Sequence, residues 1–560
     1  MALRTDGFRR RLRLVKLIPL VAAALVLWRT GQFLVPGHRE QWQQRAEQTF
    51  FQRISLPAER GIIYDRYGNP LALNWPTIDL LQKVETDTLP RVFRQMGLKP
   101  KRSPLLKKRM AVPLKFHLSD TLEPIVQRYT KLLRATPSWT RIYPAGPATS
   151  SLLGMLGNDN RGLDGVEYFF DRQLAGRDGY KYLFFTRSRK SVFQLPELPF
   201  REPQPGRDLY LTIDRDLSEL CYLALRHGVD STRANWGFAV VMDPKTGDVL
   251  AMVSYPSADP ARGVASTRNR TIVDPYEPGS VFKVVVYSLA YSRHLITPET
   301  PVDTRPGWIR VGRYRIGDVH AHGGRVMSYA EALVHSSNVA AAKLALQIPA
   351  EDLYRWARAL GVGQRTGVEL PGESPGRIQP LKRWKDVEKA AFAIGHGVMV
   401  TGLQMAVIYS AIANGGLLLR PHVLAEGHPR PDVVRRVFRP GVADTLRQIL
   451  QRVVEEGTGR RARIPGVAVA GKTGTAIKVN PRTRRYDYNR VITSFIGFLP
   501  ADDPRYVINV VVDEPRVGKY GGDVAAPIFR RIAQGALALE AWRAPVAYHQ
   551  GPKNEAIRTP

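Results

Sequence analysis

Residues 236–254 are Trp236-Gly-Phe-Ala-Val-Val-Met242, Asp243-Pro-Lys-Thr-Gly-Asp248 and Val249-Leu-Ala-Met-Val-Ser254. The two outer segments are short apolar runs, and the segment between them is rich in Asp, Pro and Gly, which favour turns. This pattern predicts an antiparallel hairpin. The hairpin opens a second part of the chain, because the sequence from about residue 40 to 230 has only short, irregular apolar runs.

Two further stretches extend the prediction to a whole domain. Residues 402–415 form an apolar run that ends in Asn-Gly-Gly, which predicts a helix with a stop signal. Residues 494–498 and 506–512 are apolar and flank a turn rich in Pro and Asp, which predicts another hairpin. Helical patterns lie between the first and the last hairpin. The sequence therefore predicts an α+β fold, with an antiparallel sheet flanked by helices.

Composition limits the class of protein. The 560 residues predict about two to four domains, and a hydrophobic content of 44% is enough to fold them. The single cysteine, Cys221, excludes a disulfide-stapled fold and a thiolate zinc cluster. Lys and Arg number 82 against 50 Asp and Glu, so the formal net charge is +32 and indicates an anionic partner or surface. Nucleic-acid binding is one alternative that follows from this charge, but no recognised nucleic-acid fold is present, and we expect no such partner.

The amino-terminal segment predicts a membrane anchor. Residues 1–16 contain six basic residues and one acid, and an uncharged run from Leu17 to Trp28 follows. That run alone fits a signal-peptide core better than a bilayer span, which needs roughly 20 residues. It extends to Val35 if Arg29 snorkels to the interface, and we therefore expect an uncleaved signal anchor. The basic flank places residues 1–16 in the cytoplasm. A buried helix of a cytosolic protein is the alternative.

Ser280 and Lys283 are the first candidate reactive pair. They lie in Glu277-Pro-Gly-Ser-Val-Phe-Lys283, where a turn leads into an apolar helical run, and a spacing of three places them on one helix face. A lysine kept neutral by apolar neighbours can take the proton of a serine and make it a nucleophile. Chance produces roughly one or two Ser-x-x-Lys matches in a chain of this length, so this motif alone also fits an exposed helix without chemistry.

Two more groups of residues could join this pair. Ser336 and Asn338 precede an alanine-rich helical run and offer a hydroxyl and an amide, although they would also make a sensible helix cap. An apolar strand ends in Lys472-Thr-Gly-Thr475, where Lys472, Thr473 and Thr475 could bind a carboxylate and Gly474 leaves room for an extended peptide.

The order of the three motifs along the chain strengthens the interpretation that they belong to one site. Ser336 and Lys472 follow Ser280 by 56 and 192 residues, and the chain has no second Ser-x-x-Lys or Ser-x-Asn. Lys245-Thr-Gly247 repeats the letters of the third motif, but it lies in the turn of the first hairpin, and turn chemistry explains it.

With these three motifs in this order, the chain resembles the serine acyl-transferases that react with penicillin. Other stretches are similar to class B penicillin-binding proteins, and the match covers about residues 50–535. Boxes that resemble the non-catalytic pedestal of that family are Arg60–Ala72, Arg141–Gly146, Leu153–Gly154, Gly162–Glu167 and Leu174–Gly179, and Leu211–Asp214 and Gly395–Gln404 are also similar. His396 and Gly402 depart from the family's usual residues. We expect His396 to be packed or hydrogen-bonded rather than a catalytic base.

The resemblance implies a role for each motif. Ser280 would attack the carbonyl of a D-Ala-D-Ala stem peptide, and Lys283 would take the serine proton. Ser336, assisted by Lys472, would protonate the departing D-Ala, while Asn338 would orient Lys283 and hold the substrate amide. The terminal carboxylate would lie against Thr473, Gly474 and Thr475, and the N–H groups of Ser280 and Thr475 would form the oxyanion hole. An amine from a neighbouring stem peptide would then resolve the ester. The resemblance implies no metal and no organic cofactor, and it makes β-lactams covalent inhibitors.

The resemblance also implies an organisation into segments. These are a cytoplasmic tail at 1–16, a transmembrane anchor at 17–35, a β-rich pedestal of the dimerisation type at 36–230, a transpeptidase domain at 231–545 and a tail at 546–560. The protein would be a single-pass protein of the bacterial inner membrane with a periplasmic catalytic domain.

The stretch Gly154–Gly162 is most similar to the septal, cell-division branch of the family. That branch implies partnership with an FtsW-like glycosyltransferase of the SEDS family and with other division proteins. An elongation-type transpeptidase is the nearest alternative. A D,D-carboxypeptidase or β-lactamase-like hydrolase, in which water resolves the ester, and a non-catalytic β-lactam sensor are further alternatives.

Overall fold

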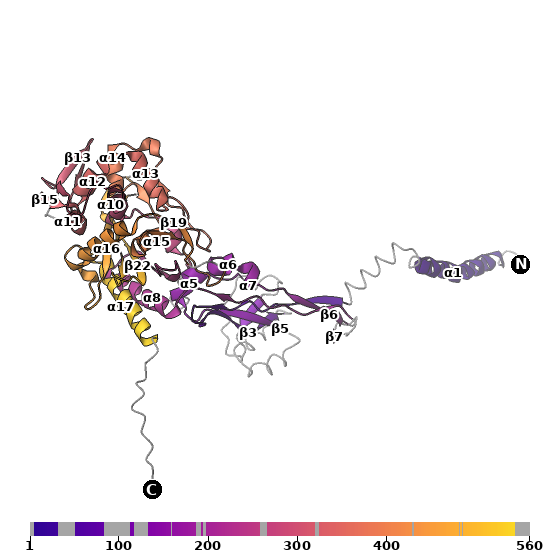
Figure 1. Cartoon of the computed structure of the whole chain (residues 1–560). Coiled ribbons are helices and arrows are strands. Elements are labelled where there is room, and N and C mark those ends of the chain that lie inside the picture. Colours follow the sequence, from indigo (N-terminus) through magenta and orange to yellow (C-terminus); the bar gives the residue numbers. More distant parts are fainter. Residues whose placement is uncertain are drawn as a thin grey trace, which may run out of the picture. The chain divides into compact units, whose positions relative to one another are not determined.

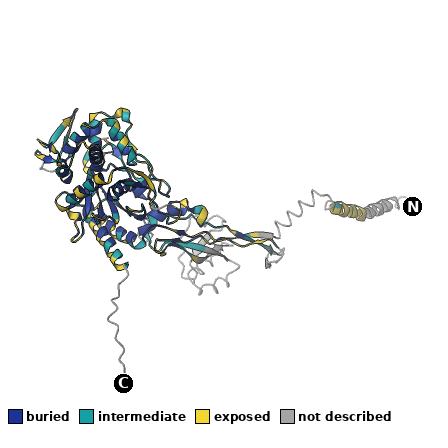
Figure 2. Cartoon of the chain, viewed as in Figure 1, coloured by how far each residue is buried: buried dark blue, intermediate teal, exposed yellow. Residues whose placement is uncertain are grey.

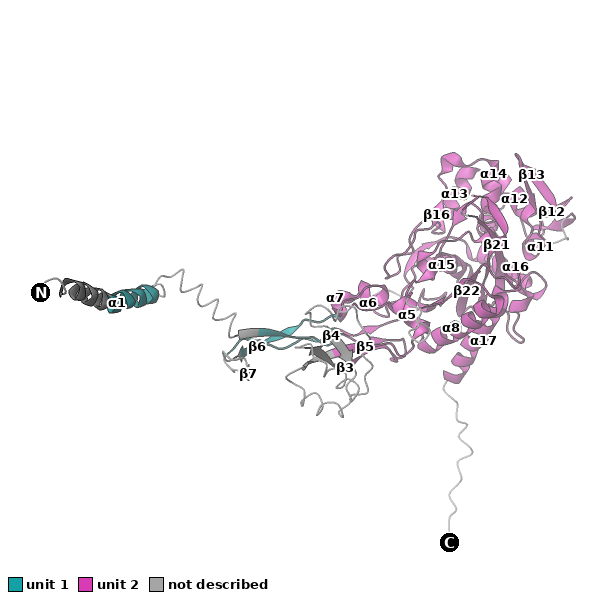
Figure 3. Cartoon of the chain, turned by 180° about the vertical axis from the view of Figure 1, so that it is seen from behind, with its two compact units in different colours: residues 1–60, 175–206 teal, residues 61–174, 207–560 magenta. Residues whose placement is uncertain are grey.

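The computed structural model describes residues 5–31, 51–82, 113–116, 133–157, 159–185, 192–193, 198–257, 266–319, 324–427, 431–480, 482–483 and 485–543. The expected tail at 546–560 lies outside the described residues. The chain forms two compact units, coloured separately in Figure 3. Unit 1 contains residues 1–60 and 175–206, and unit 2 contains residues 61–174 and 207–560.

Unit 1 contains a helix and a small sheet. The helix α1 spans Thr5–Gly31, and the apolar side chains from Ile18 to Trp28 are exposed. In the sheet, β1 (Phe51–Leu56) pairs antiparallel with β6 (Gly179–Phe185), which also pairs with β7 (Val192–Phe193) and β8 (Phe200–Arg201). Among the residues whose side chains are described, we find no helix with the length and apolar character that a membrane span requires.

Unit 2 begins with a second sheet and three short helices. The strands are β2 (Ile63–Tyr64), β3 (Pro70–Gln82), β4 (Pro113–Phe116), β5 (Leu133–Ile142) and β9 (Leu209–Tyr210), in the order β4-β3-β2-β9 with β5 paired to β3. The helices are α5 (Pro147–Leu153), α6 (Gly165–Phe169) and α7 (Asp171–Leu174). A buried ion pair, Arg141 Nε to Glu167 Oε1 at 2.7 Å, links β5 to α6.

The centre of unit 2 is a five-stranded antiparallel sheet in the order β11-β10-β22-β21-β20. The predicted first hairpin is confirmed as β10 (Trp236–Met242) and β11 (Val249–Tyr255). The second is confirmed as β21 (Tyr486–Leu499) and β22 (Tyr506–Asp513). The strand β21 begins eight residues earlier than the predicted start at 494, because its first part pairs with β20 (Ala470–Val479), the strand that precedes it in the chain.

Helices cover both faces of this sheet, which is why its strands are apolar on both sides (Figures 1 and 2). Ala239 and Val241 of β10 share a core with α8 (Arg215–Thr232) and α17 (Ala525–Arg543). The alternate residues Val240 and Met242 face a larger core with α15 (Gly402–Ala413) and α16 (Pro440–Glu455). The helix α15 confirms the prediction at 402–415. The expected α+β fold is thus confirmed.

The other elements of unit 2 lie between β11 and β20 in the chain. They are α9 (Arg270–Val273), the 3₁₀ helix η3 (Gly279–Phe282), α10 (Lys283–Ser292), β12 (Pro301–Asp303), β13 (Trp308–Val311), β14 (Tyr314–Gly317), β15 (Val326–Ser328), α11 (Tyr329–Val334), α12 (Asn338–Leu346), α13 (Ala350–Ala359), β16 (Arg377–Ile378), η4 (Leu381–Arg383), α14 (Asp386–Ala393), β17 (Val398–Met399), β18 (Leu417–Leu419), β19 (Val433–Arg436) and η5 (Arg460–Ala462).

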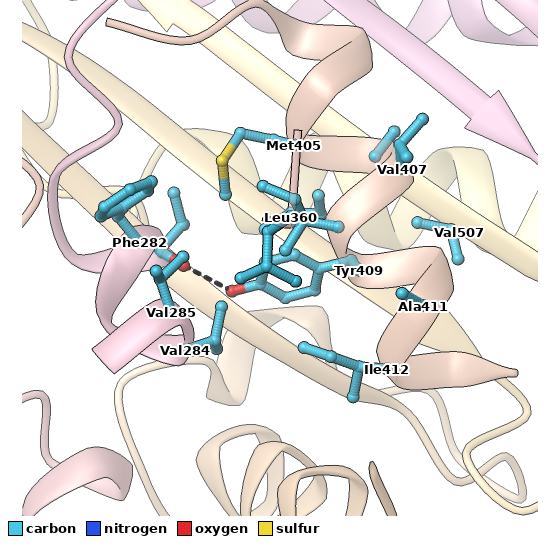
Figure 4. Close-up of a cluster of buried hydrophobic side chains, with 14 of the residues drawn as sticks. Phe282, Val284, Val285, Leu360, Met405, Val407, Tyr409, Ala411, Ile412 and Val507 are labelled. Carbon is cyan, nitrogen blue, oxygen red and sulfur yellow. Dashed lines mark hydrogen bonds between the residues drawn. The ribbon is translucent and has the colours of Figure 1, made fainter. Parts of the chain in front are cut away.

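The helix α10 is buried along its length from Lys283 to Tyr291. Its apolar side chains pack against those of α15, and Figure 4 shows Phe282, Val284 and Val285 next to the Tyr409 ring. The Tyr409 hydroxyl donates a hydrogen bond of 2.9 Å to the Val281 carbonyl. The α15 helix therefore holds the short 3₁₀ turn that precedes α10 in place.

Candidate active site

Ser280 lies in η3, one turn before α10, and not in the α-helix itself. Gly279 adopts a φ of +61°, and a Cβ there would lie 2.7 Å from the carbonyl oxygen of Thr475. Only a glycine fits this close approach of η3 to β20. The tight turn thus brings the first and third motifs together.

Ser336 and Asn338 form the second side of the site. Ser336 precedes α12 and has a φ of +60°, an uncommon backbone conformation for a residue with a Cβ. Asn338 begins α12, and Ser337 caps it by accepting a hydrogen bond from the Ala340 N–H. In the Ser-Ser-Asn stretch, the residue that caps the helix is therefore Ser337. Ser336 and Asn338 instead accept hydrogen bonds from Lys283.

The two candidate lysines converge on Ser336. Lys283 Nζ donates to the Ser336 carbonyl at 2.6 Å, to Ser336 Oγ at 3.2 Å and to Asn338 Oδ1 at 2.7 Å. Lys472 Nζ, from β20, donates to the same Ser336 Oγ at 2.8 Å. Three segments that are far apart in the sequence therefore meet at one hydroxyl. The Ser280 hydroxyl forms no hydrogen bond within the described part of the chain.

Burial sets the protonation of these lysines. Both side chains are fully buried, with an exposed fraction of 0%. Desolvation lowers the pKa of Lys283 to about 7, although the carboxylate of Asp318 acts in the opposite direction. Desolvation and then the charge of Lys283 hold the pKa of Lys472 well below its ordinary value. A neutral Lys283 is available as a base near neutral pH.

The acylation rate should therefore rise with pH through about 7. Lys283 must be neutral to accept a proton, and with its pKa lowered to about 7 the neutral fraction grows from ~0.1 at pH 6 to ~0.9 at pH 8. Stopped-flow acylation by a chromogenic β-lactam measures this profile. A rate that rises only near pH 10, the range of an ordinary lysine, would contradict the role of Lys283.

The motifs open into a cleft of about 480 Å³. Six of the predicted site residues line this cleft: Ser280, Ser336, Asn338, Thr473, Gly474 and Thr475. The other two, Lys283 and Lys472, are fully buried. Its other lining residues are Val319, Ile394, His396, Thr458, Arg460, Arg461, Ile477, Tyr488, Val491, Lys519, Tyr520, Gly521, Gly522 and Asp523.

One wall of the cleft is the strand β20, which is an edge strand of the central sheet. Thr473 Oγ1 lies 2.7 Å from the hydroxyl of Thr458, and Thr475 Oγ1 accepts a hydrogen bond of 3.1 Å from the Gly521 N–H. A Cβ on Gly474 would lie 2.3 Å from Ser494 Oγ. The wall thus offers hydroxyls beside an unpaired strand edge, which suits an extended peptide with a carboxylate.

Asp318 is a site residue that the sequence did not reveal. Its Oδ1 accepts from the Asn338 N–H at 2.5 Å and from the Val339 N–H at 3.0 Å, and its carboxylate also accepts from the Ser337 hydroxyl. It therefore fixes the first turn of α12, which carries Asn338. No local pattern marks it, since it lies 20 residues before Asn338.

Asp318→Asn is expected to move the pH profile of acylation to lower pH. The Asp318 charge raises the pKa of Lys283, so its removal should lower that pKa further and release the neutral base earlier. Asp318→Ala should also lose the hydrogen bonds to α12, and its free energy of unfolding should be ~1–3 kcal/mol lower. The pH profile and thermal melts of both variants check this. An unchanged midpoint in Asp318→Asn would restrict Asp318 to a structural role.

Glu277 joins three segments beside the nucleophile. Its carboxylate accepts a hydrogen bond of 2.9 Å from the Gly397 N–H, contacts His396 Nδ1 at 3.0 Å and accepts from the Tyr486 hydroxyl at 3.3 Å. Burial and the Glu277 charge raise the pKa of Tyr486 to about 12. The expectation that His396 is hydrogen-bonded is confirmed, although its ring also lines the cleft.

The Lys245-Thr-Gly247 turn lies outside this site. Lys245 Nζ contacts Asp503 at 2.5 Å, and Gly247 has a φ of +87°. The turn interpretation is confirmed, and the residues that line the cleft do not include it.

Comparison with known proteins identifies the family to which this chain belongs. Residues 237–534 match the penicillin-binding protein transpeptidase domain, and residues 55–211 match the penicillin-binding protein dimerisation domain. The chain belongs to the class B penicillin-binding proteins. Class B penicillin-binding proteins named as D,D-transpeptidases are similar over nearly the whole chain, so the expectation that this protein is an enzyme of that class is confirmed.

Individual relatives support this family assignment. The probable peptidoglycan D,D-transpeptidase PbpC of Pseudomonas aeruginosa is 32% identical, over 94% of this chain and 95% of its own length. The peptidoglycan D,D-transpeptidase FtsI of Escherichia coli is 33% identical, over 90% and 87%. Among solved structures, penicillin-binding protein 3 of Mycobacterium tuberculosis in complex with aztreonam has a TM-score of 0.68 and 30% identity, covering 87% of this chain and 97% of that one.

Proposed function

We propose that this class B penicillin-binding protein cross-links peptidoglycan stem peptides in the septal wall during cell division. The observation that carries the proposal is the convergence of Lys283 and Lys472, both fully buried, on Ser336 in a cleft that also contains Ser280. Similarity to FtsI of Escherichia coli supports the septal assignment. The proposed substrates are stem peptides that end in D-Ala-D-Ala, and β-lactams would be covalent inhibitors.

Acylation would use the first motif. Ser280 Oγ attacks the carbonyl carbon of the penultimate D-Ala, and its proton passes to the neutral Nζ of Lys283. The N–H groups of Ser280 and Thr475 stabilise the oxyanion that forms. Thr473, Gly474 and Thr475 hold the terminal carboxylate along the edge of β20, and Asn338 holds the substrate amide.

Collapse of the tetrahedral intermediate would use the second motif. The C–N bond to the terminal D-Ala breaks, and the departing amine takes the proton of Ser336 Oγ. Lys283 passes the proton that it took from Ser280 on to Ser336 Oγ, and Lys472, which also donates to that oxygen, stabilises the negative charge that develops there. The amine of a second stem peptide then attacks the ester, forms the new amide and leaves Ser280 free with its proton restored.

Mass spectrometry after exposure to a penicillin tests the nucleophile. The proposal expects a single adduct on the peptide that contains Ser280, and an adduct on any other peptide would refute the assignment. Incubation with a stem pentapeptide and an acceptor amine tests the second half. Formation of an amide supports cross-linking, whereas release of D-Ala with hydrolysis alone would favour a D,D-carboxypeptidase, and no release would favour a sensor.

We also propose the expected segments: an anchor at 17–35 between a cytoplasmic tail at 1–16 and a periplasmic body, with a pedestal at 36–230, a transpeptidase domain at 231–545 and a tail at 546–560. The exposed apolar side chains of α1 between Ile18 and Trp28 support the anchor, since water disfavours such a helix face. A chain that lacks residues 1–35 should appear in the soluble fraction.

An FtsW-like glycosyltransferase and other division proteins are the proposed partners. Depletion of this protein should give filamentous cells with blocked septa. Rounded or widened cells would instead favour the elongation-type transpeptidase.

A further inference from the structure

The two-stranded ribbon of β13 and β14 concentrates arginines in an unusual way. The strands are antiparallel, and Arg310 of β13 lies directly opposite Arg315 of β14. Like charges that face each other across a strand pair destabilise it, and a two-stranded ribbon has little stability of its own. The arrangement is therefore unfavourable for the ribbon in isolation.

One face of the ribbon is attached to the domain. Ile309, Val311 and Ile316 pack against Ala342 of α12 and Ala390 of α14. Figure 1 shows β13 beside these helices at the edge of unit 2. Because side chains alternate along a strand, this attachment turns the other face of the ribbon outward.

The outward face combines cations with an aromatic ring. Arg310 and Arg315 are exposed, and the Arg315 guanidinium lies 4.3 Å from the centre of the Trp308 ring. Arg313, in the turn, lies 5.1 Å from the Tyr314 ring. Within the described residues, no carboxylate forms an ion pair with these three arginines, whereas the exposed Arg293 is paired with Asp352. Guanidinium groups without a carboxylate partner fit carboxylates, and a guanidinium stacked on an aromatic ring keeps its N–H donors in its own plane.

The ribbon ends at the proposed active site. The carbonyl of Gly317, the last residue of β14, accepts a hydrogen bond of 2.9 Å from Asn338 Nδ2. Val319, two residues later, lines the catalytic cleft. A polymer that reaches across the outward face is therefore beside the cleft.

We propose that this ribbon binds an uncross-linked peptidoglycan strand, with Arg310 and Arg315 on the carboxylates of its stem peptides and the Trp308 ring holding the Arg315 guanidinium in place. The inference rests on the proposed function, because it names a second contact for the same substrate. It explains why two arginines remain opposite each other without an acid: the partner charge arrives with the polymer.

Binding of soluble glycan strands by the full chain tests this surface. The double variant Arg310→Gln/Arg315→Gln should bind peptide-bearing strands about 10-fold or more weakly than the unmodified protein. Strands stripped of their peptides should bind the unmodified protein about as weakly, because the carboxylates are gone. The control Arg226→Gln/Arg435→Gln removes two exposed arginines from α8 and β19 and should bind like the unmodified protein.

Two further measurements separate the possible failures. Acylation of Ser280 by a penicillin should be unchanged in both double variants, because neither pair touches the cleft. Unchanged strand binding by Arg310→Gln/Arg315→Gln, or an equal loss in the control, would overturn the ribbon's role while leaving the proposed function intact. Binding to anionic phospholipid vesicles but not to strands would overturn it in favour of a membrane surface. Absence of any penicillin adduct on Ser280 in the unmodified protein would instead refute the proposed function.

Discussion

Ser280→Ala is expected to abolish covalent labelling by penicillin and to lower transpeptidation by ~10⁴ or more, because the attacking oxygen is lost and neither lysine can replace it. The fold should survive, since Ser280 lines the cleft and its hydroxyl forms no hydrogen bond within the described residues. Mass spectrometry for the adduct and a chromogenic assay for turnover measure the effect. This variant has the largest predicted effect because it removes a bond-forming atom.

The result also decides between two serines. Ser336 Oγ, and not Ser280 Oγ, is the hydroxyl that both lysines contact in this structure. If Ser336 were the nucleophile, Ser280→Ala would still be labelled. The matched control is Ser288→Ala on α10, which removes a buried hydroxyl that accepts from Trp356 Nε1. That variant should lower the melting temperature and keep the adduct.

Lys283→Met is expected to slow acylation by ~10³, within the range that loss of a general base produces. Methionine keeps most of the side chain's length, so packing within α10 changes little. The variant should also lose the pH dependence near 7, because the group that titrates there is gone. In addition, the pKa of Lys472 should rise, since the Lys283 charge is one of the causes that lower it.

Single-turnover acylation across pH measures this variant against Lys389→Met. Lys389 is also buried and donates a hydrogen bond of 3.0 Å to a carbonyl, that of Leu346, but it lies outside the cleft. The control should lose stability and acylate within about 2-fold of the unmodified rate. A comparable slowing in both variants would show that Lys283 acts through stability alone.

The central sheet was predictable because its strands carry their own signals. Residues 236–254 show two apolar runs around a turn, and local pattern is sufficient to predict a hairpin. The full length of β21 was not predictable, because its first residues are polar and are strand only through pairing with β20. Without an apolar pattern, this part of the strand carries no local signal, although its partner β20 ends at Val479, shortly before it in the chain.

The sequence by itself determined which residues could do the chemistry: a serine and a lysine three residues apart, a second serine with an asparagine, and a lysine before two threonines. Short motifs survive in a sequence because their chemistry depends on residue type and spacing. Only the tertiary structure decided that Lys283 and Lys472 are fully buried and meet at Ser336, that Asp318 holds α12, and that β20 is an edge strand. The physical reason is that desolvation and charge coupling depend on every group packed around an atom, and these groups come from segments up to about two hundred residues apart.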